Sequence, residues 1–482
     1  MLLQFTVTKP NNVSNIIIPI AQTNDLKKEL KSILGLDVKA FESFSADHKE
    51  LFTTYTNGQN VYLLGLGKNP TAKQILHALR YFFHNHKTKI QGDIYLDYHH
   101  LALESLESAV NGIYLASYDI QLYKTNLDSF PNLFQASTTL TIGLANEEAL
   151  AEAQRLAKRG EEIASTQKEV LNLVNAPSNK KIPQTLVDWA TKSGKRYGYS
   201  VEVFDKEKLE KLGLQTIVAV SCGSANPPFM LVLEYKSQDA KTTIGLVGKG
   251  VTFDTGGFSL KDSTNMHYMK CDMAGAGGIL GAIELCAKWN LPVHVVAVIP
   301  TTENTLDGLS LKPGDVIGSY LGKTIEVIDT DAEGRLILAD GLAYLNKNYQ
   351  PDVLIDMATL TGSCVATLGY VAGGYFTNNE ALSQQIWQSA EATGERLWRL
   401  PLWDDYKGDI SSDIADLRNY SGKPVAGAIS AAKFLEVFTE NHPAYAHIDM
   451  AGVSFTDSDF ASMKSATAYG VRLLVDFLEK QQ

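Results

Sequence analysis

Residues 244–261 read IGLVGKGVTFDTGGFSLK, an apolar run that leads through a Gly-Lys-Gly step and Asp254 into a Gly-Gly turn. The run Ile244–Val247 is typical of a strand buried on both faces. In sheets of parallel strands, ligand sites lie at the carboxyl ends of the strands. This stretch therefore predicts a parallel sheet that presents Lys249, Asp254 and Lys261 at its active edge.

The rest of the C-terminal region supports this fold. From about Ile182 onward, apolar runs alternate with helical patterns, and such alternation predicts an α/β domain with a mostly parallel central sheet and helices on both faces. The predicted strands are Thr216–Val220, Met230–Tyr235, Ile244–Val247, His294–Pro300, Val353–Met357 and His447–Met450. The predicted helices are Ala274–Trp289, Leu336–Asn348 and Ile429–Glu440.

A chain of 482 residues is long enough for at least two domains. Residues 1–146 are predicted to form a small, non-catalytic α/β domain, and residues 176–482 the larger catalytic domain. Between them, residues 147–175 carry apolar side chains at helical spacings, with Asn146 as a plausible N-cap. We interpret this segment as a helix that connects the two domains; the alternative is one more core helix.

Composition narrows the class of protein. The net charge of -11 argues against a general nucleic-acid binder, although it leaves room for a local basic patch. The four cysteines form no CxxC pair, which favours reduced thiols in a reducing compartment. Neither a signal peptide nor an apolar run of about 18 residues is evident. We therefore expect a cytoplasmic protein with no membrane association.

Acidic residues gather in three short segments. Asp254 follows the strand, Asp272 lies in MKCDMAGAG (269–277), and DTDAEGRLILAD (329–340) contributes Asp331 and Glu333. Four carboxylates brought together repel one another unless cations neutralise them. Oxygen-rich sites favour Mg, Mn and, less exclusively, Zn, and paired metals suit hydrolysis. The alternative is a set of solvated loop acids.

Three basic residues accompany these acids. Lys249 lies between two glycines and can ligate a metal only as a neutral amine, which burial and a nearby dication both favour. Lys261 can place an ammonium beside an oxyanion in the transition state. Arg335 can hold an anion in a bidentate fork. For any one of these residues alone, an ordinary surface position is the alternative.

Several familiar motifs are absent from the sequence. There is no HExxH zinc helix and no GxSxG nucleophile elbow. GAGGILG (275–281) lacks the third glycine of a dinucleotide fingerprint, so a helix start packed on the sheet is the better interpretation. A two-metal phosphoesterase and a DNA-binding regulator stay open as rival functions; DNA binding is disfavoured by the acidic charge but not excluded.

The motifs as a group resemble the cytosolic leucyl aminopeptidase family. The likeness rests on VGKGVTFDTGGFSLK with MKCDMAGAG, on DTDAEGRLILADGL, and on MATLTG (357–362). LVNAPSN (173–179) and HIDMAG (447–452) add weaker support. The resemblance covers roughly the C-terminal two-thirds of the chain.

This resemblance implies a metalloaminopeptidase that hydrolyses peptides with a free N-terminus and prefers a leucine-like first residue. It implies two divalent ions per subunit, Zn or Mn with Mg possible at one position, held by Lys249, Asp254, Asp272, Asp331 and Glu333. The implied catalytic residues are Lys261 and Arg335, with bicarbonate bound at the arginine. The implied substrate-binding residues are Met269, Asp329, Thr359, Leu360 and Gly362. A homohexamer is also implied.

One position departs from the family pattern at the site. Asp329 stands where asparagine is more usual and adds negative charge near the metals. None of the implied ligands is replaced. We therefore expect an active enzyme, in which the added charge of Asp329 could change the metal preference or the pH optimum.

Overall fold

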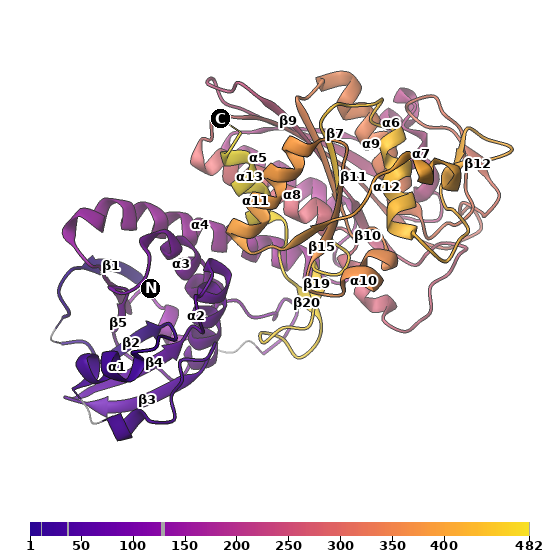
Figure 1. Ribbon diagram of the computed structural model, residues 1–482. Helices are drawn as coiled ribbons and strands as arrows, with labels where there is room; N and C mark the ends of the chain where they lie inside the picture. The colour runs from indigo at the N-terminus through magenta and orange to yellow at the C-terminus, as the bar shows by residue number, and fades with distance from the viewer. Residues whose placement is uncertain (11, 36–37, 127–130, 482) are drawn as a thin grey trace. The chain divides into compact units, whose positions relative to one another are not determined.

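The computed structural model describes residues 1–10, 12–35, 38–126 and 131–481 (Figure 1). The chain divides into two compact units, Met1–Lys168 and Glu169–Gln482. The division falls inside α4 (Leu150–Asn175), a helix preceded by η4 (Glu147–Ala149). Asn146 caps this segment by accepting a 3.0 Å hydrogen bond from Ala149 N. The domain limits at 146 and 175 and the connecting role of the helix stay predictions.

The first unit is built on a six-stranded sheet of order β1-β6-β5-β2-β4-β3, in which only the pairing of β3 with β4 is antiparallel. Alternate residues of β2 enter separate cores, Ile17 in one and Ile16 and Ile18 in the other, because the sheet is covered on both faces. The strands are β1 (Leu2–Thr6), β2 (Asn15–Ile20), β3 (Leu51–Thr56), β4 (Gln59–Gly65), β5 (Ile94–Asp97) and β6 (Thr139–Gly143). The other helices are α1 (Leu26–Leu34), η1 (Val38–Phe41), α2 (Ala72–His86), η2 (Leu103–Ser105), α3 (Leu106–Leu115) and η3 (Asn132–Phe134).

The second unit contains a nine-stranded sheet of order β16-β15-β18-β14-β9-β11-β8-β7, with β10 paired to β11. Its central strands β18, β14, β9 and β11 are parallel, and antiparallel pairings occur toward both edges. This confirms the predicted α/β class with a mostly parallel sheet. The strands are β7 (Ser200–Phe204), β8 (Phe229–Lys236), β9 (Thr243–Gly248), β10 (Gly250–Asp254), β11 (His294–Asn304), β14 (Val353–Ala358), β15 (Gly373–Thr377), β16 (Leu397–Arg399) and β18 (Tyr445–Asp449).

Helices cover both faces of this sheet. One layer contains α5, α8, α11 and α13, and the other contains α6, α7, α9 and α12 (Figure 1). Their bounds are α5 (Pro183–Tyr197), α6 (Lys206–Leu212), α7 (Gln215–Ser221), α8 (Ala274–Trp289), α9 (Glu333–Tyr349), α10 (Gly362–Leu368), α11 (Glu380–Thr393), α12 (Gly427–Val437) and α13 (Val471–Glu479). The remaining short elements are η5 (Met266–Cys271), η6 (Asp404–Ile410), β12 (Val316–Ile317), β13 (Ile325–Glu326), β17 (Leu417–Arg418), β19 (Phe455–Thr456) and β20 (Ser465–Ala466).

Helix α8 packs directly on the sheet, which confirms the interpretation of GAGGILG as a helix start. A Cβ placed on Gly275 would lie 2.2 Å from the carbonyl oxygen of Met357 in β14, a distance that no side chain tolerates. Small residues let the first turn of α8 approach the strand closely. That approach brings Asp272, two residues before the helix, to the end of the sheet.

One predicted strand is wrong. Residues 216–220 form the helix α7, although the β-branched run Thr-Ile-Val favours a strand locally. The carboxylate of Asp340 accepts a 2.9 Å hydrogen bond from Thr216 N and so caps the start of the helix from a distant part of the chain. Tertiary capping therefore outweighs the local propensity. No described helix is long and apolar enough to cross a membrane.

Candidate metal centre and active site

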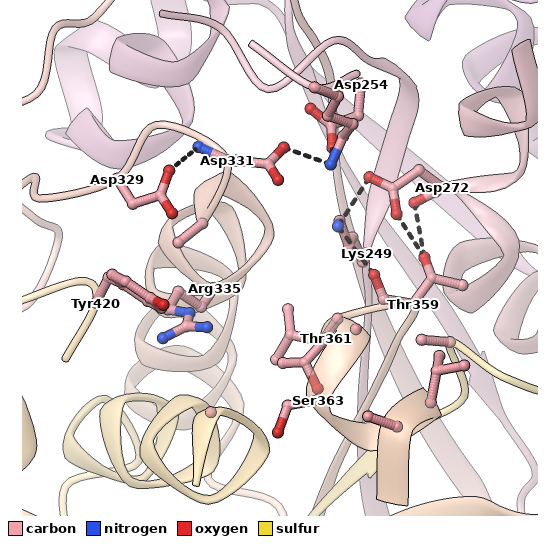
Figure 2. A pocket seen from close by; sticks show the side chains of 18 of the residues that line it. Lys249, Asp254, Asp272, Asp329, Asp331, Arg335, Thr359, Thr361, Ser363 and Tyr420 are labelled. Atoms are coloured by element: carbon pink, nitrogen blue, oxygen red, sulfur yellow. Dashed lines mark hydrogen bonds and ion pairs between the residues drawn. The ribbon is translucent and has the colours of Figure 1, made fainter. Parts of the chain in front are cut away.

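The acidic segments converge at the carboxyl edge of the nine-stranded sheet (Figure 2). Lys249 lies between β9 and β10, and Asp254 ends β10. Asp272 follows η5, and Glu333 begins α9 directly after Asp331 and Ala332. Lys249 and Asp254 lie at the carboxyl ends of β9 and β10, whereas Asp272 and Glu333 lie at the N-terminal ends of α8 and α9, the helices that lead back to β11 and β14. In such a sheet the carboxyl ends of the strands and the N-terminal ends of the helices share one edge, so these segments meet there.

Each lysine lies between carboxylates. Lys249 Nζ is 2.8 Å from Asp272 Oδ2 and 2.8 Å from Glu333 Oε1, and it donates to the carbonyl oxygen of Thr359 at 3.0 Å. Lys249 is so enclosed that a Cβ on Gly334 would lie 2.5 Å from its Cε. Only glycine at 334 leaves room for this lysine beneath the first turn of α9.

Lys261 makes the corresponding pairs on the other side of the cluster. Its Nζ lies 2.8 Å from Asp254 Oδ2 and also pairs with Asp331 Oδ1. Lys249 is nearly inaccessible, whereas the Lys261 side chain retains 24% of its exposure. Lys261 can therefore meet a molecule in the cavity, while Lys249 belongs to its floor.

Burial and neighbouring charges shift the pKa of several groups in the cluster. Burial raises the pKa of Asp272 to about 7, and burial together with Asp254 and Glu333 raises that of Asp331 to about 8. Burial alone lowers the pKa of Lys249, but the adjacent Asp272 and Glu333 charges outweigh it and the pKa is raised overall. Asp272 and Asp331 thus resist ionisation unless a positive charge lies beside them.

The residues fit a divalent cation. Asp254, Asp272 and Glu333 are all buried, and one carboxylate oxygen from each lies within 4.8 Å of the others. Glu333 Oε2 is buried and accepts no hydrogen bond from any residue that the structure describes. With all four acids ionised and both lysines protonated, the cluster would carry a net charge of -2, which oxygen-binding cations neutralise. A buried, oxygen-rich and undersatisfied cluster is the environment that a metal ion requires.

Neighbouring polar groups hold the carboxylates in place. Asn304, which ends β11, donates from Nδ2 to Asp254 Oδ1 at 2.8 Å and to the carbonyl oxygen of Thr330 at 3.0 Å. Thr359 donates from its hydroxyl to Asp272 Oδ1 at 2.7 Å. Asn304 is not among the site residues predicted from the sequence, although its place at the carboxyl end of a central strand was a usable signal.

A cavity of about 690 Å³ opens above the cluster. Eleven of the twelve predicted site residues line it: Lys249, Asp254, Lys261, Met269, Asp272, Asp329, Asp331, Arg335, Thr359, Leu360 and Gly362. Glu333 is the exception: it is buried and pairs with Lys249, which does line the cavity. Apolar lining comes from Met269, Leu360, Val365, Ala366 and Ala451. The structure brings the predicted residues together, while their individual roles stay predictions.

Arg335 faces the cavity apart from the carboxylate cluster, with Tyr420 beside it and Thr361 and Ser363 opposite (Figure 2). Burial lowers its pKa to about 10, so the guanidinium stays protonated at neutral pH. Asp329 also lines the cavity and accepts a 2.8 Å hydrogen bond from Asp331 N. The site therefore offers a fixed cation beside the acidic floor, suited to an anion or a polar group of a substrate.

A buried acidic cluster at the carboxyl edge of a mostly parallel sheet is typical of a metal-dependent hydrolase. The model of the cytosol aminopeptidase family, catalytic domain, matches residues 169–475. A probable cytosol aminopeptidase of Chloroherpeton thalassium is 37% identical over 96% of this chain and 96% of its own length. The chain belongs to the cytosol aminopeptidase family and is, by that membership, a metalloaminopeptidase.

Other similarities agree with this assignment. A probable cytosol aminopeptidase of Chlorobium luteolum is 50% identical over 69% of this chain, and the match spans 65% of that relative's length. A tomato leucine aminopeptidase mutant superimposes with a TM-score of 0.88 at 29% identity, covering 100% of this chain and 96% of that one. The bottromycin maturation enzyme BotP in complex with Mn gives a TM-score of 0.84 at 28% identity, covering 97% and 99%.

Proposed function

We propose that this chain binds two divalent metal ions and releases N-terminal amino acids, preferably leucine-like ones, from peptides. The observation that carries this proposal is the buried trio Asp254, Asp272 and Glu333, whose oxygens lie within 4.8 Å at the floor of a cavity. Lys249 and Asp331 complete the proposed ligand set. Asp254 and Glu333 are proposed to serve both ions.

The bound ions would supply Lewis acidity toward the scissile carbonyl and would lower the pKa of water. Lys249 must lose its proton to ligate, and its contacts with Asp272 and Glu333 hold its nitrogen among the other donors. In the metal-free protein the same contacts let the ammonium neutralise the acids. Lys249 thus stabilises the carboxylate cluster in both the metal-bound and the metal-free protein.

Lys261 and Arg335 are the proposed catalytic residues. The Lys261 ammonium is partly exposed to the cavity and can stabilise an oxyanion as negative charge develops on the substrate. Arg335 is proposed to hold bicarbonate, which would accept a proton from the attacking water. Support for this comes from a buried guanidinium that stays charged and whose Nε has no hydrogen-bond partner among the described residues.

The cavity lining supports a peptide substrate with a free N-terminus. Met269 and Gly362 are proposed to border the first side chain, where the apolar lining favours a leucine-like residue. Thr359 and Leu360 are proposed to contact the substrate backbone. Asp329 lines the same cavity and is proposed to contact the substrate.

Metal identity and assembly are part of the proposal. Zn and Mn are the proposed ions, with Mg possible at one position, and the Mn complex of BotP supports Mn. A homohexamer in the cytoplasm is proposed from the family resemblance, and the names of the relatives support the location. Light scattering of purified protein tests the hexamer.

The decisive experiment measures hydrolysis of leucine p-nitroanilide by purified protein after chelation and after return of Mn or Zn. Activity that is lost and then restored by metal is the expected result. Glu333→Gln should stay folded and lack restored activity, whereas Lys195→Met, an exposed change distant in sequence from the site, should match wild type. A folded, metal-loaded wild type without amide hydrolysis would contradict the proposal.

A further inference from the structure

Asn419 is a fully buried polar residue that none of the sequence motifs contains. It follows β17, which pairs with β13 in parallel register, and its side chain and backbone are 0% exposed. Asn419 N donates to the carbonyl oxygen of Glu326 at 3.0 Å, which extends the pairing by one step. Asn419 is therefore held firmly at the start of the loop that carries Asp331.

The side-chain amide of Asn419 binds this loop from both of its ends. Oδ1 accepts from Ile328 N at 2.8 Å and from Asp329 N at 3.3 Å. Nδ2 donates to the carbonyl oxygens of Asp329 at 2.6 Å and of Ala332 at 3.4 Å. Because the loop presents donors on one side and acceptors on the other, only an amide satisfies both.

The backbone carbonyl of Asn419 contacts Arg335, the proposed catalytic arginine. Arg335 Nη1 donates to it at 2.7 Å, and Arg335 is only 4% exposed. Arg335 Nε is buried without a hydrogen-bond partner in the part of the chain that the structure describes. The carbonyl group of Asn419 therefore determines where the Arg335 guanidinium lies. The position of this carbonyl group in turn depends on the hydrogen bonds between the Asn419 side chain and the loop that carries Asp331.

We propose that Asn419 is a positioning residue that joins the Arg335 guanidinium to the loop that carries Asp331. It thereby fixes the position of Arg335, the proposed bicarbonate-binding residue, relative to Asp331, a proposed metal ligand. This inference rests on the roles proposed above for Arg335 and Asp331. A displacement of about 1 Å in a catalytic group can cost about 100-fold in rate. Partners that orient metal ligands typically contribute 10- to 100-fold to metal affinity or activity.

A purely structural asparagine provides the matched control. Asn15 in the first unit is 1% exposed and donates to the carbonyl oxygens of Gln91 at 2.8 Å and Asp93 at 3.3 Å. It also accepts from Asn60 Nδ2 at 3.2 Å. Asn15→Ala removes a comparable set of buried bonds from the unit that contains none of the proposed site residues.

The test compares full-length wild type, Asn419→Ala, Asn419→Asp and Asn15→Ala. Mn²⁺ binding to chelated protein is measured by titration calorimetry, melting by scanning fluorimetry, and kcat and KM with leucine p-nitroanilide at saturating Mn²⁺. We expect both Asn419 variants to lose about 10- to 100-fold in kcat with KM within about threefold. One class of Mn²⁺ site should weaken by a similar factor, while Asn15→Ala melts earlier but keeps both properties.

Asn419→Asp covers the case in which Asn419→Ala does not fold. Aspartate has the size of asparagine and keeps the oxygen that accepts from Ile328 N. Its second oxygen replaces the amide nitrogen and therefore cannot donate to the carbonyl oxygens of Asp329 and Ala332. Folded Asn419 variants with kcat and Mn²⁺ affinity within threefold of wild type would overturn the inference, as would equal losses in Asn15→Ala. If wild type itself hydrolyses no amide, the proposed function fails, and Mn²⁺ affinity alone then decides the role of Asn419.

Discussion

Lys181 allows a sharp prediction because it is 0% exposed in the folded chain. Its Nζ donates to the carbonyl oxygen of Val174 at 3.1 Å and to that of Lys270. These acceptors lie near the ends of α4 and η5, so the lysine fastens the segment that leads into Asp272. The perturbation is Lys181→Met, which keeps an unbranched side chain and removes the charge.

The magnitude follows from the pKa. Burial lowers the pKa of Lys181 from 10.5 to about 7, since the charged form loses its hydration. Between these values the unfolded chain binds one proton more than the folded chain, so stability rises with pH. At about 1.4 kcal/mol per pH unit, the wild type should gain about 5 kcal/mol relative to Lys181→Met. Below pH 7 the difference between the two proteins should stay constant.

The assay is the melting temperature of chelated protein from pH 6 to pH 10.5. For a unit of this size, 5 kcal/mol corresponds to a relative shift of about 10 °C. Loss of the hydrogen bonds to Val174 and Lys270 lowers the melting temperature of Lys181→Met by the same amount at every pH. It therefore does not alter how the difference between the two melting temperatures depends on pH. Lys195→Met, an exposed control, should melt in parallel with wild type. A constant difference between wild type and Lys181→Met across this range would refute the reasoning.

Three further outcomes are expected at the site. Glu333→Gln should weaken Mn²⁺ binding more than tenfold by calorimetry, because it removes charge from a buried ligand; unchanged affinity would exclude Glu333 as a ligand. Lys261→Ala should lower kcat more than it raises KM, and equal binding with unchanged kcat would remove its transition-state role. Mn²⁺ at 100 times its Kd should stabilise the chelated protein by about 2.7 kcal/mol, seen as a higher melting temperature; a melt insensitive to Mn²⁺ would count against a metal centre.

Local sequence was sufficient for the central sheet and the active edge. The apolar run Ile244–Val247 predicts its strand from a few residues, and so does the turn at Lys249, which lies between two glycines, before Asp254. Such predictions succeed because apolar patterning and turn chemistry are local properties. The same reasoning located Asp331 before α9. Parallel pairing then places such segments at one edge, so the approximate site was predictable without coordinates.

Only the tertiary structure decided which distant groups complete these segments. Asn419 reaches the loop at Asp329 across 90 residues, and Asp340 caps α7 at Thr216 across 124 residues. Lys181 looks like a surface lysine in sequence but becomes buried between the carbonyls of Val174 and Lys270. These contacts depend on strand register and helix packing. The pattern of apolar and polar residues predicts only which side of a helix or strand faces the core. A buried polar group is therefore assigned its partner by the complete fold and not by its neighbours in the chain.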